Sequence, residues 1–485
     1  THTNTESSAA SDVYKRQLNT LIDMASQQNL SLRIAGIRIL EARAQLGIAI
    51  GDLYPQSQSV GGNATYTSAS ENAANTSPVA DYNYGTIDLG FDAAWELDFW
   101  GKFRRAVESN LGKLETSIAS YDDILVTLTA EVARTYVIIR KQEALLTIAR
   151  ENVKIQEQSL KIVETRFKEG DITELDVQQA QTLLQDTKAT IPRIQIGLRQ
   201  GKNGLAVLLG MLPGELETVL TSSKPIPTTP TEANVGIPSE LLRRRPDIRL
   251  AERQVASQSA LIGVAKADLY PHFSLFGSIG LQTSNADLTS AGYPGGSSFS
   301  DLWSSDSVYF IGGPAISWNI FNYGRIKNQV RVQDARFQQL VVNYQDTVLK
   351  AAQEVEDAMV AYLRSQDEMK YLTESVKAAT RSVDLSMIQY QEGMVDYQRV
   401  LDSQRAQSQA QNRLTEAEGS VTLNFVALYK ALGGGWQIRE GRDFVPEETI
   451  KTMQERTDWG NLLTPEESET PPEDEDRLRW RAPDW

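Results

Sequence analysis

The region after Gly101 has apolar residues at alternating intervals of four and three positions. This heptad spacing predicts a helix with a continuous apolar seam. No Gly or Pro interrupts residues 113–169, so we expect one helix over about 102–168. Such a helix needs neighbours along its whole length, because helices gain most of their stability from packing. The seam consists of Val107, Leu111, Leu114, Ile118, Tyr121, Leu125, Leu128 and Val132.

Residues 87–99 alternate instead, with apolar side chains on one face and acidic or small ones on the other. A period of two predicts a β-strand, and this one exceeds the ~5–6 residues of an ordinary strand. Such faces suit a strand with lipid on one side and water on the other. A long strand of a soluble sandwich is the alternative. We expect Ile87, Leu89, Phe91 and Trp95 to face lipid, and Asp88 and Asp92 to face water.

The chain contains a long internal duplication. At an offset of 223 residues, Trp95, Gly101 and Glu169-Gly170 recur as Trp318, Gly324 and Glu392-Gly393. Upstream the offset is 216, and Gly47 and Asp52–Pro55 recur as Gly263 and Asp268–Pro271. Just past Gly170 the offset becomes 226, and Leu175-Asp176 matches Leu401-Asp402. Length changes collect in loops, which places a loop in each of these intervals.

Each copy is expected to hold a helix, two strands and a long helical hairpin. The predicted elements are helices over 17–51 and 238–267, strands over 57–67, 87–99, 273–281 and 308–320, and second hairpin helices over 171–209 and 394–432. The resulting domains are a leader remnant (1–16), a first repeat (17–220), a linker (221–237), a second repeat (238–436) and an acidic C-terminal tail (437–485). The run 465–477 is Pro-rich and acidic, which is typical of disorder.

Glu169-Gly170 and Glu392-Gly393 end the long helices, because Gly readily takes the left-handed conformation of such a turn. Asp171 with Glu174 resembles a capping box for the next helix. Pro192 is expected to kink that helix.

Four strands cannot close a membrane barrel, which needs about eight. An open edge in lipid leaves backbone groups without hydrogen bonds, at several kcal/mol each. A barrel built from this chain would therefore be shared between copies.

Composition excludes several classes of function. The formal net charge is −15, which disfavours a non-specific nucleic-acid binder. The chain has no Cys and only two His, His2 and His272, so thiol chemistry is excluded and neither a metal site nor a cofactor is predicted. We find no apolar run of the ~20 residues that a spanning helix needs. No nucleotide-binding loop or nucleophile–base pair is present, and we expect no enzyme.

Five stretches together resemble the outer-membrane efflux factors, the TolC-like family, and most closely its OprM-like lipoprotein branch. They are Leu241–Ile248 (LLRRRPDI), Ala267–Pro271 (ADLYP), Ala94–Gly101 (AWELDFWG), Asp176–Gln181 (DVQQAQ) and Tyr429–Trp436 (YKALGGGW). The resemblance covers about residues 17–436. It implies a mixed α and β fold: a trimeric 12-stranded outer-membrane β-barrel, four strands per chain, continuous with a long periplasmic α-helical barrel.

The same resemblance implies a homotrimer in outer-membrane lipid that works with a periplasmic adaptor protein and an inner-membrane pump. The family's gate aspartate and arginine match Asp402 and Arg405, and Gln398 stands where near relatives have a gate leucine. Asp176 is the repeat partner of Asp402, with Gln179 in place of the arginine. Adaptor docking falls on the hairpin tips, Glu169, Gly170, Glu392 and Gly393.

Three copies of Asp402 around an axis would form a carboxylate ring, which can select and gate permeant species. A solvated helix residue is the alternative.

The three arginines 243–245 could bind an anion, but a structural ion-pair cluster is the favoured interpretation. Overall the sequence predicts a passive export duct for small molecules, in the outer membrane of a Gram-negative cell and extending into the periplasm. A duct for secreted polypeptides and a soluble trimeric coiled-coil scaffold stay as alternatives.

Overall fold

The computed structural model describes residues 16–72, 81–220, 224–230, 244–286 and 298–463. They form two compact units. The strand unit comprises residues 40–116 and 252–342 with the chain end after 459, and the hairpin unit comprises residues up to 39, 117–251 and 343–458. Most of the predicted leader and linker, and the acidic run 465–477, lie outside the described residues.

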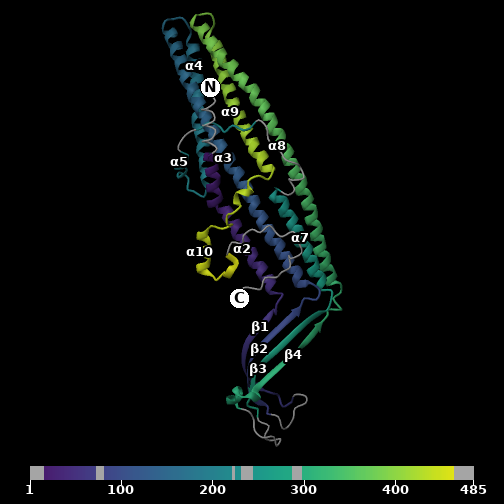
Figure 1. Ribbon diagram of the computed structural model, residues 1–485. Coiled ribbons are helices and arrows are strands. Elements are labelled where there is room, and N and C mark those ends of the chain that lie inside the picture. Colours follow the sequence, from purple (N-terminus) through teal and green to yellow (C-terminus); the bar gives the residue numbers. More distant parts are fainter. Residues whose placement is uncertain (1–15, 73–80, 221–223, 231–243, 287–297, 464–485) are drawn as a thin grey trace. The chain divides into compact units, whose positions relative to one another are not determined.

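The strand unit contains one sheet of four antiparallel strands in the order β1-β2-β3-β4 (Figure 1). The strands are β1 (Ser57–Ser68), β2 (Asn83–Leu97), β3 (His272–Ser284) and β4 (Val308–Ser317). The first hairpin pairs Ser57 with Ala94, the second pairs His272 with Ser317, and β2 pairs with β3 between the copies. Each predicted strand is present, and β2 starts four residues before Ile87.

Successive side chains of β2 point to opposite faces of the sheet. Leu89 and Phe91 therefore share a face, and both are exposed, at 41% and 42%. Asp88 and Asp92 belong to the other face. The alternation predicted from the sequence is thus confirmed in β2, and within the described part of the chain Leu89 and Phe91 of its apolar face are left exposed.

Four helices contribute residues to both units. They are α2 (Leu30–Gly51), α3 (Lys102–Lys168), α7 (Pro246–Ala267) and α8 (Arg325–Gln391). The bounds of α3 are those predicted. The helix expected over 17–51 is interrupted at Asn29, whose side-chain oxygen accepts a hydrogen bond from the Leu32 amide at 3.0 Å and so caps α2.

The start of α3 packs closely on α7 within the strand unit. The hydroxyls of Ser109 and Ser257 lie 3.0 Å apart, and both residues are buried. A Cβ atom at Gly263 would meet Arg105 Cγ at 2.9 Å. Glycine at this position of α7 thus permits the close approach of α3.

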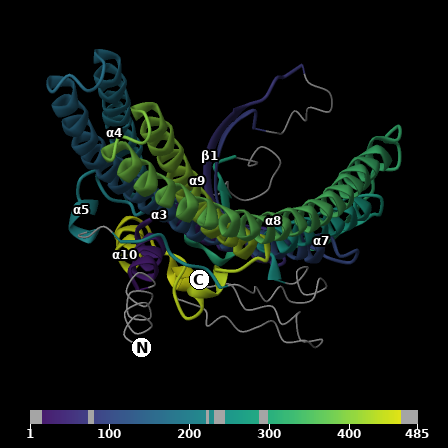
Figure 2. The ribbon, with the colours of Figure 1, turned by 90° about the horizontal axis from the view of Figure 1, so that it is seen from above.

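The hairpin unit contains two long helical hairpins, whose turns lie at the same end of the unit (Figure 1). The first is formed by α3 and α4 (Glu174–Leu208), the second by α8 and α9 (Tyr397–Ala431). Seen from above, α4 lies beside α3 and α9 beside α8 (Figure 2). A short helix α5 (Leu216–Val219) follows α4. Pro192 lies inside α4, which continues through it.

The second helix of each hairpin starts three residues later than predicted. Thr173, not Asp171, is the N-cap of α4, and its partner three residues on is Asp176 instead of Glu174. In the second hairpin the Asp396 side chain caps α9 by accepting from the Arg399 amide at 3.3 Å. The predicted Asp171–Glu174 capping box is therefore wrong.

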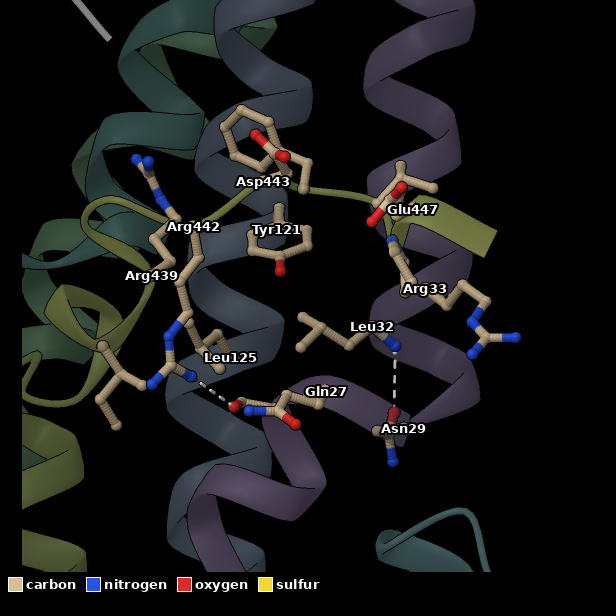
Figure 3. A pocket seen from close by; sticks show the side chains of 15 residues that line it. Gln27, Asn29, Leu32, Arg33, Tyr121, Leu125, Arg439, Arg442, Asp443 and Glu447 are labelled. Carbon is tan, nitrogen blue, oxygen red and sulfur yellow. Dashed lines mark hydrogen bonds between the residues drawn. The ribbon is translucent and has the colours of Figure 1, made fainter. Parts of the chain in front are cut away.

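The segment after Trp436, predicted as the start of an acidic tail, folds in its described part. It contains α10 (Glu447–Arg456) and packs on α3, where Phe444 meets the ring of Tyr121 edge-on at 5.2 Å. A cavity of about 330 Å³ lies between this segment, α3 and the chain around Asn29 (Figure 3). Arg439 fastens the segment by an ion pair to Asp122, which is completely buried and also pairs with Arg249 at 2.8 Å.

Arg245 lies at the start of α7, where its guanidinium pairs with Asp247 and Glu354, each at 2.7 Å. The predicted structural ion-pair cluster is thus present at this arginine. Burial and the neighbouring Asp247 raise the pKa of Asp123 nearby. None of the helices in the described part of the chain is both long and apolar enough to cross a membrane.

Candidate functional site at the hairpin tips

Both hairpins turn at the predicted glycines. Gly170 and Gly393 have φ angles of +84° and +72°, a region that side-chain-bearing residues rarely adopt. No atom lies within 4 Å of where a Cβ would stand at either residue, so glycine is required by backbone conformation and not by space. Glu169 and Glu392, beside these glycines, are exposed. The turns thus present short, unobstructed tips.

A shared apolar core lies directly beneath the two tips. Tyr390 and Tyr397 pack edge-on with ring centroids 5.4 Å apart. The core takes residues from both hairpins, so the two tips form one packed body. Its buried members are Val163, Ala180, Leu183, Tyr390, Tyr397, Val400 and Leu401.

Arg166 joins the first tip to the second, and sequence reasoning missed it. Its guanidinium donates to the Tyr390 carbonyl at 2.7 Å and lies over the Tyr390 ring, 4.7 Å from its centre. Its Nε also lies 3.8 Å from Asp171 Oδ2. The repeat partner of Arg166 is Gln389, so this fastening exists in one copy only.

Burial raises the pKa of Tyr397 to about 12, with Tyr390 and Asp176 adding to the effect. Burial also raises the pKa of Tyr390. Both phenols are therefore neutral at any physiological pH. Among the described residues the Tyr390 hydroxyl has no hydrogen-bond partner.

The structure brings the predicted gate residues of the second hairpin together. Gln398 donates to Asp402 Oδ1 at 3.0 Å, and Arg405 Nη1 lies 3.9 Å from the same oxygen. The side chains of Asp402 and Arg405 are 61% and 49% exposed. Val400 and Leu401 of the same helix point into the core, so the polar trio faces away from it.

Asp176 is placed differently from Asp402. Its carboxylate accepts from the amide and the hydroxyl of Thr173, at 3.1 and 3.0 Å. Helices α4 and α9 start 223 residues apart, whereas Asp176 and Asp402 are 226 apart. Asp176 therefore lies in the first turn as a cap, and Asp402 lies one turn deeper in its helix.

The predicted lipid-facing residues lie on β2 in the strand unit. Leu89 and Phe91 are exposed, whereas Ile87 and Trp95 are half-buried. The Trp95 indole donates to the Leu53 carbonyl at 3.1 Å, which anchors the end of the strand to the turn before β1.

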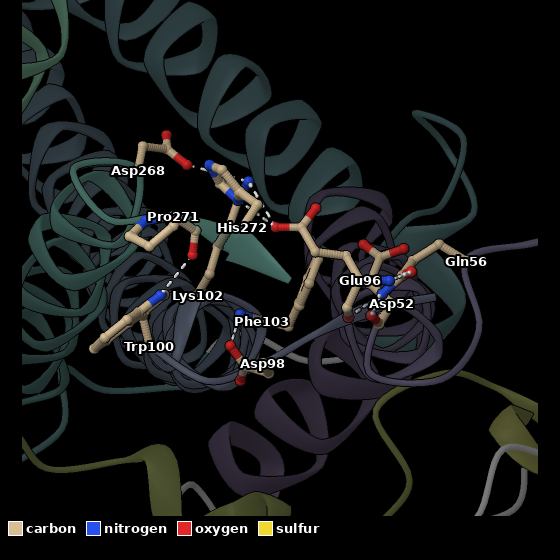
Figure 4. Close-up of polar contacts among 10 residues, drawn as sticks. All are labelled: Asp52, Gln56, Glu96, Asp98, Trp100, Lys102, Phe103, Asp268, Pro271 and His272. Carbon is tan, nitrogen blue, oxygen red and sulfur yellow. Dashed lines mark hydrogen bonds and ion pairs between the residues drawn. The ribbon is translucent and has the colours of Figure 1, made fainter. Parts of the chain in front are cut away.

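A polar network lies where the strands meet the helices of the strand unit (Figure 4). Lys102 pairs with Asp268 at 3.1 Å and with Glu96 at 3.8 Å. His272, to which the sequence assigned no chemistry, lies with Nδ1 2.6 Å from Glu96 Oε1. Asp98 caps α3 by accepting from the Phe103 amide at 3.2 Å and the Arg104 amide at 2.9 Å. Nowhere in the described ranges do three His, Cys, Asp or Glu gather closely enough to bind a metal ion.

Comparison with known proteins shows the family. The family model described as outer membrane efflux protein matches residues 21–211 and 237–434, and so covers both copies of the repeat. The cation efflux system protein CusC of Escherichia coli K12 is 30% identical over 422 residues, 86% of this chain and 87% of its own. The solvent efflux pump outer membrane protein SrpC of Pseudomonas putida is 30% identical over 424 residues, 87% of this chain and 86% of its own.

Solved structures agree with this. The outer-membrane channel OprN superposes with a TM-score of 0.81 at 32% identity, covering 87% of this chain and 91% of its own. A structure of CusC gives a TM-score of 0.75 at 28% identity, with 87% and 92% covered. The shared features are the helical hairpins and the four-stranded sheet. The chain therefore belongs to the outer membrane efflux protein family.

Proposed function

We propose that this chain is the outer-membrane channel of a tripartite efflux pump, a passive duct that carries small toxic molecules from the periplasm to the outside. The observation that carries the proposal is the pairing of a four-stranded antiparallel sheet with two long helical hairpins, matched over both repeats by a family of efflux channels. Its energy comes from the inner-membrane pump, reached through a periplasmic adaptor. Relatives named for cation efflux and for solvent efflux are similar over most of the chain. We therefore expect the wall of the duct to contribute little to substrate specificity.

Three copies would close the sheet into a 12-stranded barrel. Among the described strands, β1 and β4 have no neighbour on their outer edge, and lipid cannot supply the missing backbone hydrogen bonds. In the closed barrel Ile87, Leu89, Phe91 and Trp95 would face lipid, while Asp88 and Asp92 would line the water-filled interior. The exposure of Leu89 and Phe91 in the single chain supports this orientation.

The gate of the duct is assigned to Asp402, Arg405 and Gln398 near the second tip. Their exposure on the side of α9 away from the core leaves them free to meet the same residues of other copies. An exposed pair at 3.9 Å contributes only ~0–1 kcal/mol, which suits a closure that must open. Asp176 takes part only as the cap that shapes the first tip. The exposed tips at Glu169, Gly170, Glu392 and Gly393 would dock the adaptor.

A deletion strain tests the function directly. Loss of the chain should lower the minimal inhibitory concentration of at least one compound in a panel of drugs, solvents and metal salts, and a plasmid copy should restore it. Unchanged resistance across the panel, together with no loss of a secreted small molecule, would contradict an efflux duct. A secreted protein that disappears from the medium would favour the polypeptide duct instead.

A further inference from the structure

The two copies of the repeat share their geometry where strand meets helix. Trp95 donates to the Leu53 carbonyl at 3.1 Å, and its repeat partner Trp318 donates to the Leu269 carbonyl at the same distance. Leu53 and Leu269 are themselves repeat partners. Gly101 and Gly324, at the following turns, have φ angles of +78° and +82°. At this junction, positions related by the repeat therefore have equivalent surroundings.

Within one chain, two residues of the first copy near the start of α3 contact the Asp-Leu-Tyr-Pro stretch of the second copy. Lys102, at the start of α3, pairs with Asp268 at 3.1 Å. Trp100 stacks on Tyr270 with ring centroids 4.6 Å apart and planes 23° apart, and its indole donates to the Pro271 carbonyl at 2.8 Å. Both residues lie where β2 leads into α3, and both contact the Asp-Leu-Tyr-Pro stretch of the other copy.

The repeat predicts that the corresponding residues at the other two repeat-related positions make the same kind of contact. Lys102 and Trp100 correspond to Arg325 and Tyr323, while Asp268 and Tyr270 correspond to Asp52 and Tyr54. Charge and aromatic character are kept at all four positions. In the described part of the chain, however, neither Arg325 nor Asp52 has a charged partner, and both are exposed.

Two further features indicate that the surfaces around Tyr323 and around Gly47 contact another chain. Tyr323 is fully exposed and has a φ angle of +49°, a strained conformation for a bulky residue that persists only where surroundings hold it. Gly47 has no atom within 4 Å of an added Cβ, whereas its repeat partner Gly263 lets Arg105 approach closely. Glycine inside a helix is less stable than alanine, so a close neighbour would explain its presence at position 47.

We propose that Arg325 and Tyr323 of one chain bind Asp52 and Tyr54 of the next chain in the trimer. The geometry would be the one that Lys102 and Trp100 show toward Asp268 and Tyr270 within a single chain. The contact is head to tail, and such contacts close into a ring when the rotation permits. It brings the free edges of β4 and β1 together, as β2 and β3 meet within the chain. The inference rests on the trimer of the proposed function and deepens it by naming the surface that joins the copies.

Crosslinking tests the contact, because the chain has no native Cys. The variant Asp52→Cys/Arg325→Cys, treated in the membrane with a short bifunctional maleimide, should yield covalent dimers and trimers on a denaturing gel. The matched control Lys102→Cys/Asp268→Cys should crosslink within each chain and stay at monomer mass. Each single variant should give no ladder.

A second measurement keeps the natural charges, in case the cysteine variants fail to assemble. Arg325→Lys retains the positive charge, and a zero-length carbodiimide should join its amine to the Asp52 carboxylate of another copy, as mass spectrometry of the linked peptides would show. A stable trimer in which neither reagent links positions 52 and 325 would overturn the inference and leave the efflux duct standing. Absence of any trimer in the membrane would overturn the proposed function, and this inference with it.

Discussion

The two copies of the repeat are alike where strand meets helix and different at the hairpin tips. At the junction, Trp95 and Trp318 make the same hydrogen bond to repeat-related carbonyls. At the tips, only the first copy has Arg166 fastened to its neighbour, and only the second has the exposed Asp402–Arg405 pair. In the proposed ring of chains, repeat-related positions at the junction would meet repeat-related partners. The two tips differ instead. The first is bonded to the second through Arg166, and the second carries the residues proposed to close the duct.

The largest expected effect comes from Asp122, which has no counterpart in the second copy, where Gln345 stands. Asp122→Ala removes a completely buried carboxylate and leaves Arg249 and Arg439 without their shared partner. Breaking such a pair costs ~3–5 kcal/mol in the free energy of unfolding. Thermal unfolding in detergent, followed by circular dichroism, measures it. Gln345→Ala, the matched control at an exposed residue, should change stability by about 0.5 kcal/mol or less.

The two faces of β2 should differ next most strongly. Leu89→Arg should destabilise the membrane-inserted trimer by ~2–4 kcal/mol if Leu89 lies near the bilayer midplane, because a charge would face lipid. Asp88→Arg, the adjacent residue on the other face, should leave assembly intact. Trimer yield in outer-membrane fractions measures both, and equal tolerance at the two positions would contradict the lipid-facing assignment.

Alkaline pH should destabilise the core that lies beneath the two tips and contains Tyr397. The pKa of Tyr397 is about 12 in the folded chain and its ordinary value is 10.0, so the unfolded chain loses this proton first as pH rises. The stabilisation is complete below pH 10.0 and is lost toward pH 12, a fall of about 2–3 kcal/mol. Tyr397→Phe should flatten this part of the stability–pH curve. Tyr371→Phe, at an exposed tyrosine of α8, should leave the curve unchanged.

Making the first tip resemble the second should have a smaller effect. Arg166→Gln places the side chain of its repeat partner there and removes the bond to the Tyr390 carbonyl, at about 1.5 kcal/mol for a charged donor. Hydrogen exchange at residues 389–394 should become faster, while the rest of α8 stays protected. Arg134→Gln removes an exposed pair on the same helix and serves as the control. Equal exchange in both variants would show that Arg166 does not fasten the tips.

Elements with a local signal could be predicted from the sequence. Gly101 and Glu169-Gly170 predicted the two ends of α3, and alternation located three of the four strands; the polar β1 was predicted as the partner strand in the first copy. The start of α4 was misplaced because Thr173 and Asp176 compete with Asp171 and Glu174 for the same cap, and spacing alone does not rank them. The break at Asn29 was missed, although residues 26–29 carry no apolar side chain and Asn is a common helix N-cap.

Contacts across the fold could not be predicted in this way. Arg166 acts on a carbonyl 224 residues away, and Asp122 on an arginine 317 residues away. Neither contact can be recognised from the spacing of apolar and polar residues around Arg166 or Asp122. The duplication does extend what the sequence can predict, since a contact seen between the copies implies its counterpart at the repeat-related positions.

The proposed gate gives the smallest expected change in stability and the most direct test of the central claim. Asp402→Ala/Arg405→Ala removes an exposed pair, so the free energy of unfolding should change by no more than ~1 kcal/mol. The measurement is single-channel conductance of the purified trimer in planar bilayers. We expect the double variant to conduct more than the natural chain, and Asp176→Ala, which alters only a cap, to change conductance less. Unchanged conductance in the double variant, with normal trimer yield, would contradict a gate at the second hairpin tip.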